Sequence, residues 1–233
     1  APGAGNYITM AKAVSLARTL MGEEAVRQRS FVHAHGSSTP HNRVTESKIF
    51  DEIAKTFGIE SWPVAAVKAY LGHSLGPASG DQLMASLGSF AHGIVPGIKT
   101  IEGVADDVYA KRLQISNVDN DRGAAGCEIA FLNSKGFGGN NATATVLSPS
   151  VVHTYLEKHY GKKQMAVFQQ SQSVAVEKAS SYLQSADKGE LNPIYEFGTD
   201  LIDESQITIT PDAISLPGYA QPITLGDDEG YSF

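Results

Sequence analysis

Apolar, strand-like runs that alternate with amphipathic helices constrain the fold of the first hundred residues most strongly. A short run over 30–35 precedes a helix over 44–57 whose apolar residues share one face, and a run over 63–68 precedes a helix that opens at Gly76-Pro77. Four more strand-like runs follow one another along the chain, over 94–98, 113–118, 127–132 and 142–147. This order predicts an α/β layered domain with a mixed sheet.

The character of the sequence changes after Pro149. Helical periodicity covers 151–160 and 164–183, and from Asn192 onward four prolines interrupt any regular pattern, which predicts an extended tail. Residues 187–233 hold ten of the 25 acidic residues and one of the 18 basic residues. We therefore expect a domain over 1–148 and an acidic extension over 149–233.

Composition excludes several classes of protein. Hydrophobic residues make up 42% and charged residues 18%, which is typical of a globular chain. No apolar run reaches the roughly 18 residues of a membrane span, and no basic, aromatic-laced stripe indicates nucleic-acid binding. The single cysteine, Cys127, excludes an internal disulfide framework and a zinc cage built from cysteines. It is consistent with a reducing compartment, and we expect a cytoplasmic location.

Three segments carry residues with chemical potential. In the segment 32–40, a strand runs into a polar turn that contains His35, at the end where functional side chains often project. In the segment 67–76, Lys68 follows an apolar run and His73 lies in the next turn. The glycines of the segment 135–141 permit close approach of the backbone to a ligand.

Two kinds of site fit these residues. His33 and His35 with Lys68 and His73 resemble the ligands of metal-dependent hydrolases, but such a site requires a further aspartate and an eight-unit barrel, for which the chain is too short. The alternative is a site without a metal, in which two neutral imidazoles donate N–H bonds to an enolate or oxyanion. A cation at Lys68 would keep one imidazole neutral.

The three segments together resemble the C-terminal half of β-ketoacyl-acyl carrier protein synthases, the condensing enzymes of the thiolase fold. The family pattern A-H-G-T-S-T-P matches residues 34–40, and the lysine five residues before G-H-x-L-G matches Lys68 and residues 72–76. The closing motif G-F-G-G-x-N matches residues 136–141. The resemblance covers about residues 1–148 and implies a thiolase-like half-domain with a five-stranded mixed sheet. The extension resembles that of long-tailed bacterial members.

The implied reaction is a decarboxylative Claisen condensation of a malonyl thioester with an acyl thioester, in fatty-acid or polyketide biosynthesis. By this resemblance His35 and His73 are catalytic and hydrogen-bond the malonyl thioester carbonyl. Lys68 organises His35 electrostatically. No metal or cofactor is implied.

The resemblance also assigns residues around the substrate. The backbone at Phe137 and Gly138 would contribute to the oxyanion hole, and the Phe137 ring would gate the acyl pocket. Ser37 and Thr39 would line the route of the pantetheine arm. The implied partners are acyl carrier protein, the N-terminal half of the synthase and a second copy in a homodimer.

The chain also departs from the family pattern. The nucleophilic cysteine belongs to the family's other half, and Cys127 falls in the strand predicted over 127–132, where we expect a structural role. Gln82 stands where the family has an acid and Lys135 where it has a phenylalanine, whereas Glu46 matches a family acid. A non-catalytic partner of the same fold, similar to a chain-length factor, is the alternative function.

Overall fold

The structure is a computed structural model that describes residues 3–190, 198–199 and 201–225. Two compact units, Ala1–Phe168 and Gln169–Phe233, make up the chain. The first unit holds a five-stranded sheet in the order β4-β2-β1-β6-β7. Its strands are β1 (Ser30–His33), β2 (Trp62–Ala65), β4 (Leu113–Gln114), β6 (Ile129–Lys135) and β7 (Asn141–Leu147). All neighbours pair in parallel except β6 and β7, so the predicted mixed sheet of five strands is confirmed.

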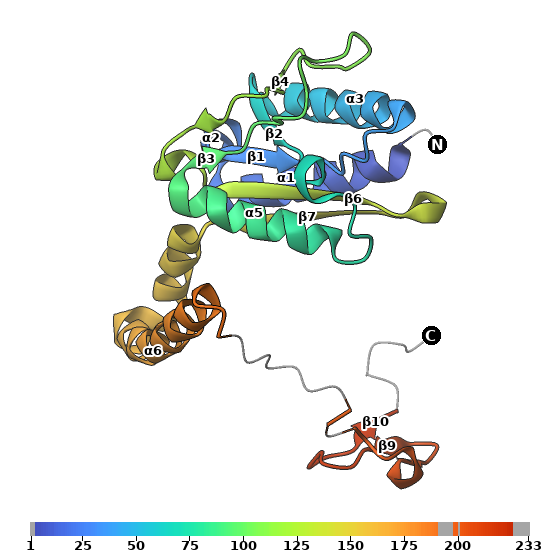
Figure 1. The fold of residues 1–233 in the computed structure, drawn as a ribbon, viewed down its shortest axis with the longest axis vertical. Coiled ribbons are helices and arrows are strands. Elements are labelled where there is room, and N and C mark those ends of the chain that lie inside the picture. Colours follow the sequence, from blue (N-terminus) through green and yellow to red (C-terminus); the bar gives the residue numbers. More distant parts are fainter. Residues whose placement is uncertain (1–2, 191–197, 200, 226–233) are drawn as a thin grey trace. The chain divides into compact units, whose positions relative to one another are not determined.

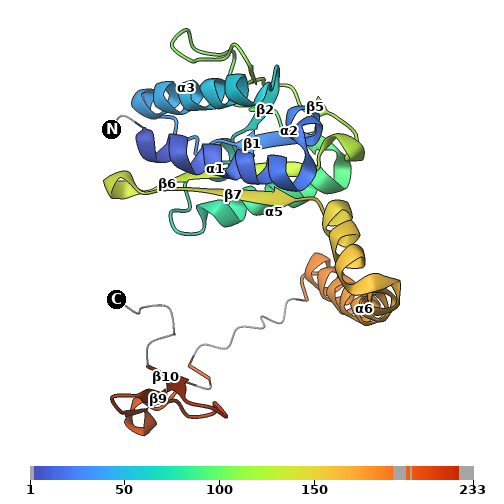
Figure 2. The same ribbon diagram turned by 180° about the vertical axis from the view of Figure 1, so that it is seen from behind.

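Helices flank both faces of this sheet. Helices α1 (Ala4–Met21) and α3 (Pro40–Phe57) cover one face, and α5 (Ala78–His92) covers the other (Figures 1 and 2). Two short helices, α2 (Glu23–Gln28) and α4 (Lys68–Leu71), precede β1 and follow β2. Local sequence sets the bounds of α3, since the Thr39 hydroxyl accepts the N–H of Asn42 at 3.4 Å and Gly58 ends the helix at φ 70°.

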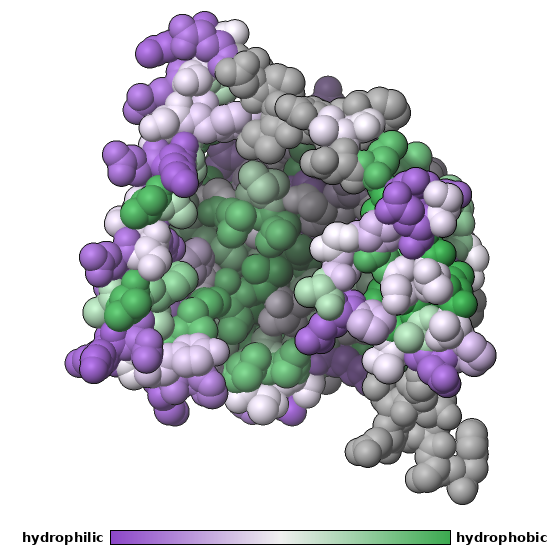
Figure 3. Space-filling model, turned by 90° about the horizontal axis from the view of Figure 1, so that it is seen from below, coloured by the Kyte–Doolittle hydropathy of each residue, from purple (hydrophilic) through white to green (hydrophobic). Residues whose placement is uncertain are grey.

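The outer side of α5 exposes apolar residues. Leu83, Met84 and Leu87 are 38%, 68% and 42% exposed, whereas Phe90 packs inward against the sheet. Figure 3, viewed from below Figure 1, shows apolar side chains gathered at the hollowed centre of the surface that it draws. This helix therefore has one face in the core and one apolar face without cover among the described residues.

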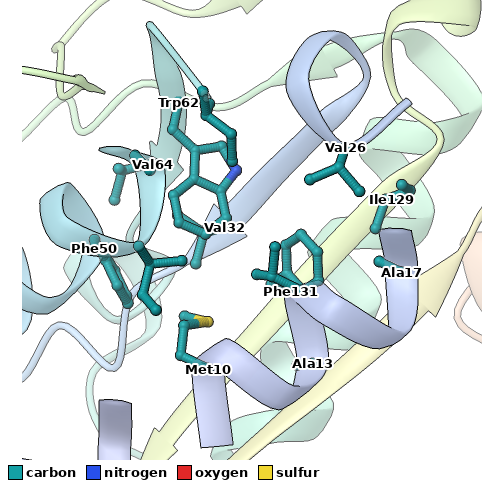
Figure 4. Close-up of a cluster of buried hydrophobic side chains, with 14 of the residues drawn as sticks. Met10, Ala13, Ala17, Val26, Val32, Phe50, Trp62, Val64, Ile129 and Phe131 are labelled. Carbon is teal, nitrogen blue, oxygen red and sulfur yellow. The ribbon is translucent and has the colours of Figure 1, made fainter. Parts of the chain in front are cut away.

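Alternation along the strands divides the core between the two faces of the sheet. Val32 and Phe131 face α1 and α3, while their neighbours Phe31 and Leu132 face α5. Figure 4 shows the larger cluster, in which Trp62 packs edge-on against Phe131 with ring centroids 5.7 Å apart. Its indole N–H donates to a buried serine hydroxyl at 3.0 Å, so the one polar atom of the ring is satisfied.

Some predicted elements are shorter or lie elsewhere. The run 94–98 forms only β3 (Ile94–Val95), which pairs with β5 (Asn120–Asp121) outside the main sheet, so its assignment to a longer strand is wrong. The run 63–68 ends as a strand at Ala65, because the chain turns into α4 there. Lys68 is therefore the first residue of a helix and not the end of a strand.

The remaining elements lie after the main sheet. The element α6 (Pro149–Asp187) consists of two helices joined across a kink at Gly161 (φ 80°), in agreement with the two helices predicted over 151–160 and 164–183. The second unit contains the end of α6 and a three-stranded antiparallel sheet, where an extended tail was predicted. Its strands are β8 (Thr208–Ile209), β9 (Ala213–Ser215) and β10 (Ile223–Thr224). Three-residue 3-10 turns are η1 (Ala124–Gly126), η2 (Phe137–Gly139) and η3 (Glu204–Gln206). The parts of the predicted tail at 192–197, 200 and 226–233 lie outside the described residues.

Within the described ranges, no helix has both the length and the apolar character needed to cross a membrane.

Candidate active site

His35 lies two residues after β1 and is held by its main chain and its ring. Its N–H and that of Gly36 donate to the two carboxylate oxygens of Glu46 on α3, at 2.7 and 3.1 Å. On the ring, Nδ1 accepts the main-chain N–H of Lys135 at 3.3 Å. The side chain is only 7% exposed. These contacts fix the imidazole at the edge formed by the ends of β1 and β6.

His73 lies in the turn between α4 and α5 and faces His35. The two rings are 5.2 Å apart between centroids and nearly perpendicular, with an interplanar angle of 81°. The Nδ1 atom of His73 accepts the N–H of Leu75 at 3.1 Å. In each neutral imidazole the acceptor nitrogen carries no proton, so the proton is on Nε2. Two N–H donors of the same kind are thus brought together.

Both histidines line a pocket of about 250 Å³. Its wall also includes Ser79 from α5, Lys135 and the start of the glycine-rich turn, Gly136. The sequence segments around residues 35, 73 and 136 therefore meet at one place. A pocket of this size with two imidazole donors suits a small carbonyl group.

Burial and nearby cations favour the neutral form of His35. Burial lowers the pKa of its imidazole most, and the ammonium of Lys68 lowers this pKa further. Burial also lowers the pKa of Lys68, whose side chain is 8% exposed and whose Nζ has no hydrogen-bond partner in the described part of the chain. Lys68 is thus close enough to act on His35 through charge, without touching it.

Glu46 is the centre of a polar network that motif matching identified only as a family acid. Besides the two main-chain donors, its carboxylate accepts from the side-chain amides of Asn42 at 3.0 Å and Asn133 at 2.6 Å. The sequence analysis missed Asn133. Its signal was a polar residue directly after the apolar run 129–132, at a position that the structure buries completely. A buried carboxylate with four donors is fully satisfied.

The other expected site residues lie around this centre. The Phe137 ring, in the turn between β6 and β7, is 96% exposed, and Gly138 adopts φ 76°. Ser37 is half-buried, and Thr39 is exposed and lines a neighbouring pocket of about 400 Å³ together with Lys135. Neither Phe137 nor Ser37 lines the pocket of the two histidines.

Cys127 is fully buried in the apolar cluster under α5. Burial raises the pKa of its thiol, which disfavours the thiolate that a nucleophile requires.

His33 does not join the pair. It is completely buried, and its ring packs edge-on against Phe31 at 5.6 Å, on the side of the sheet that α5 covers. Within the described residues, no group of three or more histidine, cysteine, aspartate or glutamate side chains is arranged to hold a metal ion. The set of ligands considered for a metal hydrolase therefore does not assemble around His33.

Comparisons with known proteins agree with the motifs. Residues 6–102 match the family model of the β-ketoacyl synthase C-terminal domain. The chain is 52% identical over 232 residues to the β-ketoacyl-[acyl-carrier-protein] synthase FabY of Pseudomonas aeruginosa. The aligned region covers 100% of this chain and 36% of that protein. It is 36% identical over 113 residues to 3-oxoacyl-[acyl-carrier-protein] synthase 1 of Escherichia coli. This second aligned region covers 48% of this chain and 26% of that protein.

A solved structure is similar over nearly the whole chain. The crystal structure of the noncanonical ketosynthase FabY from P. aeruginosa aligns with a TM-score of 0.84 at 52% identity, over 98% of this chain and 36% of that one. All of this chain aligns with FabY, but it spans only about a third of the length of that relative.

Proposed function

The chain carries a β-ketoacyl synthase C-terminal domain, and on that premise we propose that it supplies the decarboxylation site of a β-ketoacyl-acyl carrier protein synthase. The observation that carries the proposal is the pair of imidazoles 5.2 Å apart, each with Nδ1 occupied by a main-chain N–H. Both rings then carry a donor for one carbonyl oxygen. The whole protein would act in fatty-acid or polyketide synthesis.

The proposed step breaks the bond between the malonyl Cα and its carboxylate. Carbon dioxide leaves, and the electron pair forms an enolate whose negative charge lies on the thioester oxygen. The Nε2–H groups of His35 and His73 donate to that oxygen and stabilise the charge as it forms, at about 3–4 kcal/mol for each donor. A neutral His35 suits this role, because burial and Lys68 both disfavour its protonation.

The condensation itself requires residues outside this chain. The enolate carbon would attack an acyl group held as a thioester on a cysteine in the N-terminal half of the synthase, and the cysteine thiolate would leave. The burial and raised pKa of Cys127 support the view that it is not this nucleophile. We assign the N–H of Phe137 and the adjoining Gly138 to the oxyanion hole of the acyl-enzyme, and the Phe137 ring to a gate.

The same proposal covers partners and domain organisation. Acyl carrier protein would deliver both thioesters, with the pantetheine arm passing Ser37 and Thr39. The main sheet ends at Leu147, which supports a domain over 1–148 and an extension over 149–233, of which the first helical part, to Phe168, belongs to the same compact unit as the sheet. The apolar outer face of α5 supports the proposal that the N-terminal half, or a second copy in a homodimer, covers this face.

Alanine variants of the two histidines in the complete synthase test the proposal. We expect His35→Ala and His73→Ala each to lower the rate of malonyl decarboxylation by roughly 100- to 1,000-fold, because one donor to the enolate oxygen is lost. Acylation of the nucleophilic cysteine should remain mostly intact, as measured by transfer of a labelled acyl group.

His92→Ala is the control, because this histidine is exposed at the end of α5. Loss of acylation with decarboxylation retained would contradict the assigned roles. Absence of malonyl turnover in the unaltered synthase, with its cysteine half intact, would instead favour a scaffold of the chain-length-factor kind.

A further inference from the structure

Four hydrogen bonds form a closed ring around His35. The N–H of Lys135 donates to His35 Nδ1 at 3.3 Å, and the N–H of His35 donates to Glu46 Oε1 at 2.7 Å. The amide of Asn42 donates to Glu46 Oε2 at 3.0 Å and accepts from Lys135 Nζ at 2.9 Å. Lys135 therefore closes the ring twice, through its main chain and through its ammonium group.

The ring joins parts of the chain that are distant in sequence. Lys135 ends β6, Asn42 and Glu46 belong to the first turns of α3, and His35 lies in the loop after β1. His35 and Glu46 are 7% and 4% exposed, and Lys135 is half-buried. Hydrogen bonds in such a setting are stronger than in water, and each one polarises the next. A charged donor such as the Lys135 ammonium makes the stronger kind of bond.

We propose that Lys135 is a positioning residue that, through Asn42 and Glu46, holds the His35 imidazole in the orientation and the Nε2–H form that decarboxylation requires. This inference rests on the proposed function for its activity readout, but the ring itself is a property of the folded chain. At this position the chain departs from the family pattern, in which a phenylalanine could make no such bond.

Titratable groups from four parts of the chain face His35. Lys68 from α4, His73 from the turn before α5 and Lys135 from β6 all lower the pKa of His35, and Glu46 from α3 raises it. Burial is the largest cause of the lowered pKa. Protonation of Nδ1 would set its new N–H against the N–H of Lys135. Removal of the Lys135 charge should therefore make His35 easier to protonate.

Three variants of the complete synthase separate positioning from bulk structure. Lys135→Met keeps the main-chain N–H and the length of the side chain but removes the ammonium. Asn42→Ala breaks the same link from its other end, and Lys135→Arg restores a cationic donor. The matched control is Lys55→Met, which removes a lysine charge from an exposed position on α3.

The first readout is malonyl decarboxylation as a function of pH. We expect Lys135→Met to lower kcat roughly 10- to 100-fold with little change in KM, since displacement of a reacting group by about 1 Å costs up to about 100-fold. Its acid limb should move to higher pH, and Lys135→Arg should recover part of kcat. The double variant with Asn42→Ala should lose no more than the larger single loss, because both act through one link.

The second readout is the NMR titration of His35 in synthase labelled at histidine, assigned with His35→Ala. We expect the midpoint of His35 to rise in Lys135→Met and to stay unchanged in Lys55→Met. An unmoved midpoint, or an acid limb that stays in place while kcat falls, would overturn the inference. If the unaltered synthase does not decarboxylate malonyl thioesters, the proposed function fails, and the titration still decides whether Lys135 controls His35.

Discussion

His33 illustrates how a single residue can make the molecule sensitive to acid. Its ring is completely buried, and neither nitrogen has a hydrogen-bond partner in the described part of the chain. Burial, with a smaller effect of Lys68, lowers the pKa of His33 from 6.5 to about 4. In the folded protein this imidazole therefore stays neutral at a pH at which the unfolded chain already binds a proton.

We predict that the free energy of unfolding falls as the pH is lowered from about 6.5 to about 4. Over this window the unfolded state binds the proton and the folded state does not, so the His33 contribution amounts to about 3 kcal/mol. Above pH 6.5 the residue contributes no pH dependence. Thermal or urea unfolding of the complete protein at a series of pH values measures this slope.

The variant His33→Leu provides the control, because leucine fills a similar space and does not titrate. It should flatten the stability profile between pH 6.5 and 4 relative to the unaltered protein. Equal slopes in the two proteins would show that other groups cause the acid sensitivity.

At the scale of elements, Gln82 connects α5 to the sheet. This side chain is completely buried, and its amide donates to the carbonyls of Ala34 and Asn133, both at 3.1 Å. The two carbonyls belong to the chain just after β1 and to β6. One glutamine therefore holds the helix above the strand ends that carry the candidate site.

We predict that Gln82→Met lowers the free energy of unfolding by about 2–4 kcal/mol. Methionine matches the length of glutamine but donates no hydrogen bond, so two buried carbonyls lose their donor. Denaturant unfolding of the complete protein measures the change, with Gln172→Met, at an exposed position of α6, as the control. Similar stability losses in both variants would contradict the connecting role of Gln82.

The elements show what the sequence could predict and what it could not. Periodicity located the helices over 44–57 and after Pro77, because each has a continuous apolar face. The ends of strands were less certain, because residues 66–68 are apolar or amphipathic and suit either a strand or the helix α4. The short strand β3 pairs with β5 and so lies outside the main sheet. Local periodicity does not encode this contact, because it joins segments that are distant in sequence.

The same distinction applies to the candidate site. Motif spacing identified His35, Lys68 and His73, and the two histidines face each other. It did not identify Asn133, because the importance of that amide depends on which helix lies above β6. Nor did it predict the ring through Lys135, which joins residues 93 positions apart.

At the scale of the whole molecule, the apolar face of α5 bears on how the complete protein assembles. Met84 is 68% exposed here, beside Leu83 and Leu87 on the same helix. Apolar side chains gathered on one face are typical of a surface that another part covers. The relative FabY is almost three times as long as this chain.

We predict that Met84→Asp in the complete protein lowers its free energy of unfolding by about 3 kcal/mol, because the proposed cover of the α5 face would bury the new, unpaired charge. Val118→Asp should change it by less than about 0.5 kcal/mol. Val118 is a matched control at 67% exposure, but it lies in the loop between β4 and β5 and not on α5. If both variants unfold like the unaltered protein, the α5 face remains open to solvent in the complete molecule.

The donors to His35 and His73 have one further consequence, because both are peptide groups. The ring nitrogens accept from the main chain at residues 135 and 75, so the placement of each ring proton follows from the path of the backbone. Leu75 has a positive φ of 63°, so residues that adopt this left-handed conformation readily, glycine and asparagine first, would preserve the bond to His73. Proline is the exception at either position, since it has no amide hydrogen. The side chain at position 75 therefore acts on His73 through the backbone conformation that it permits.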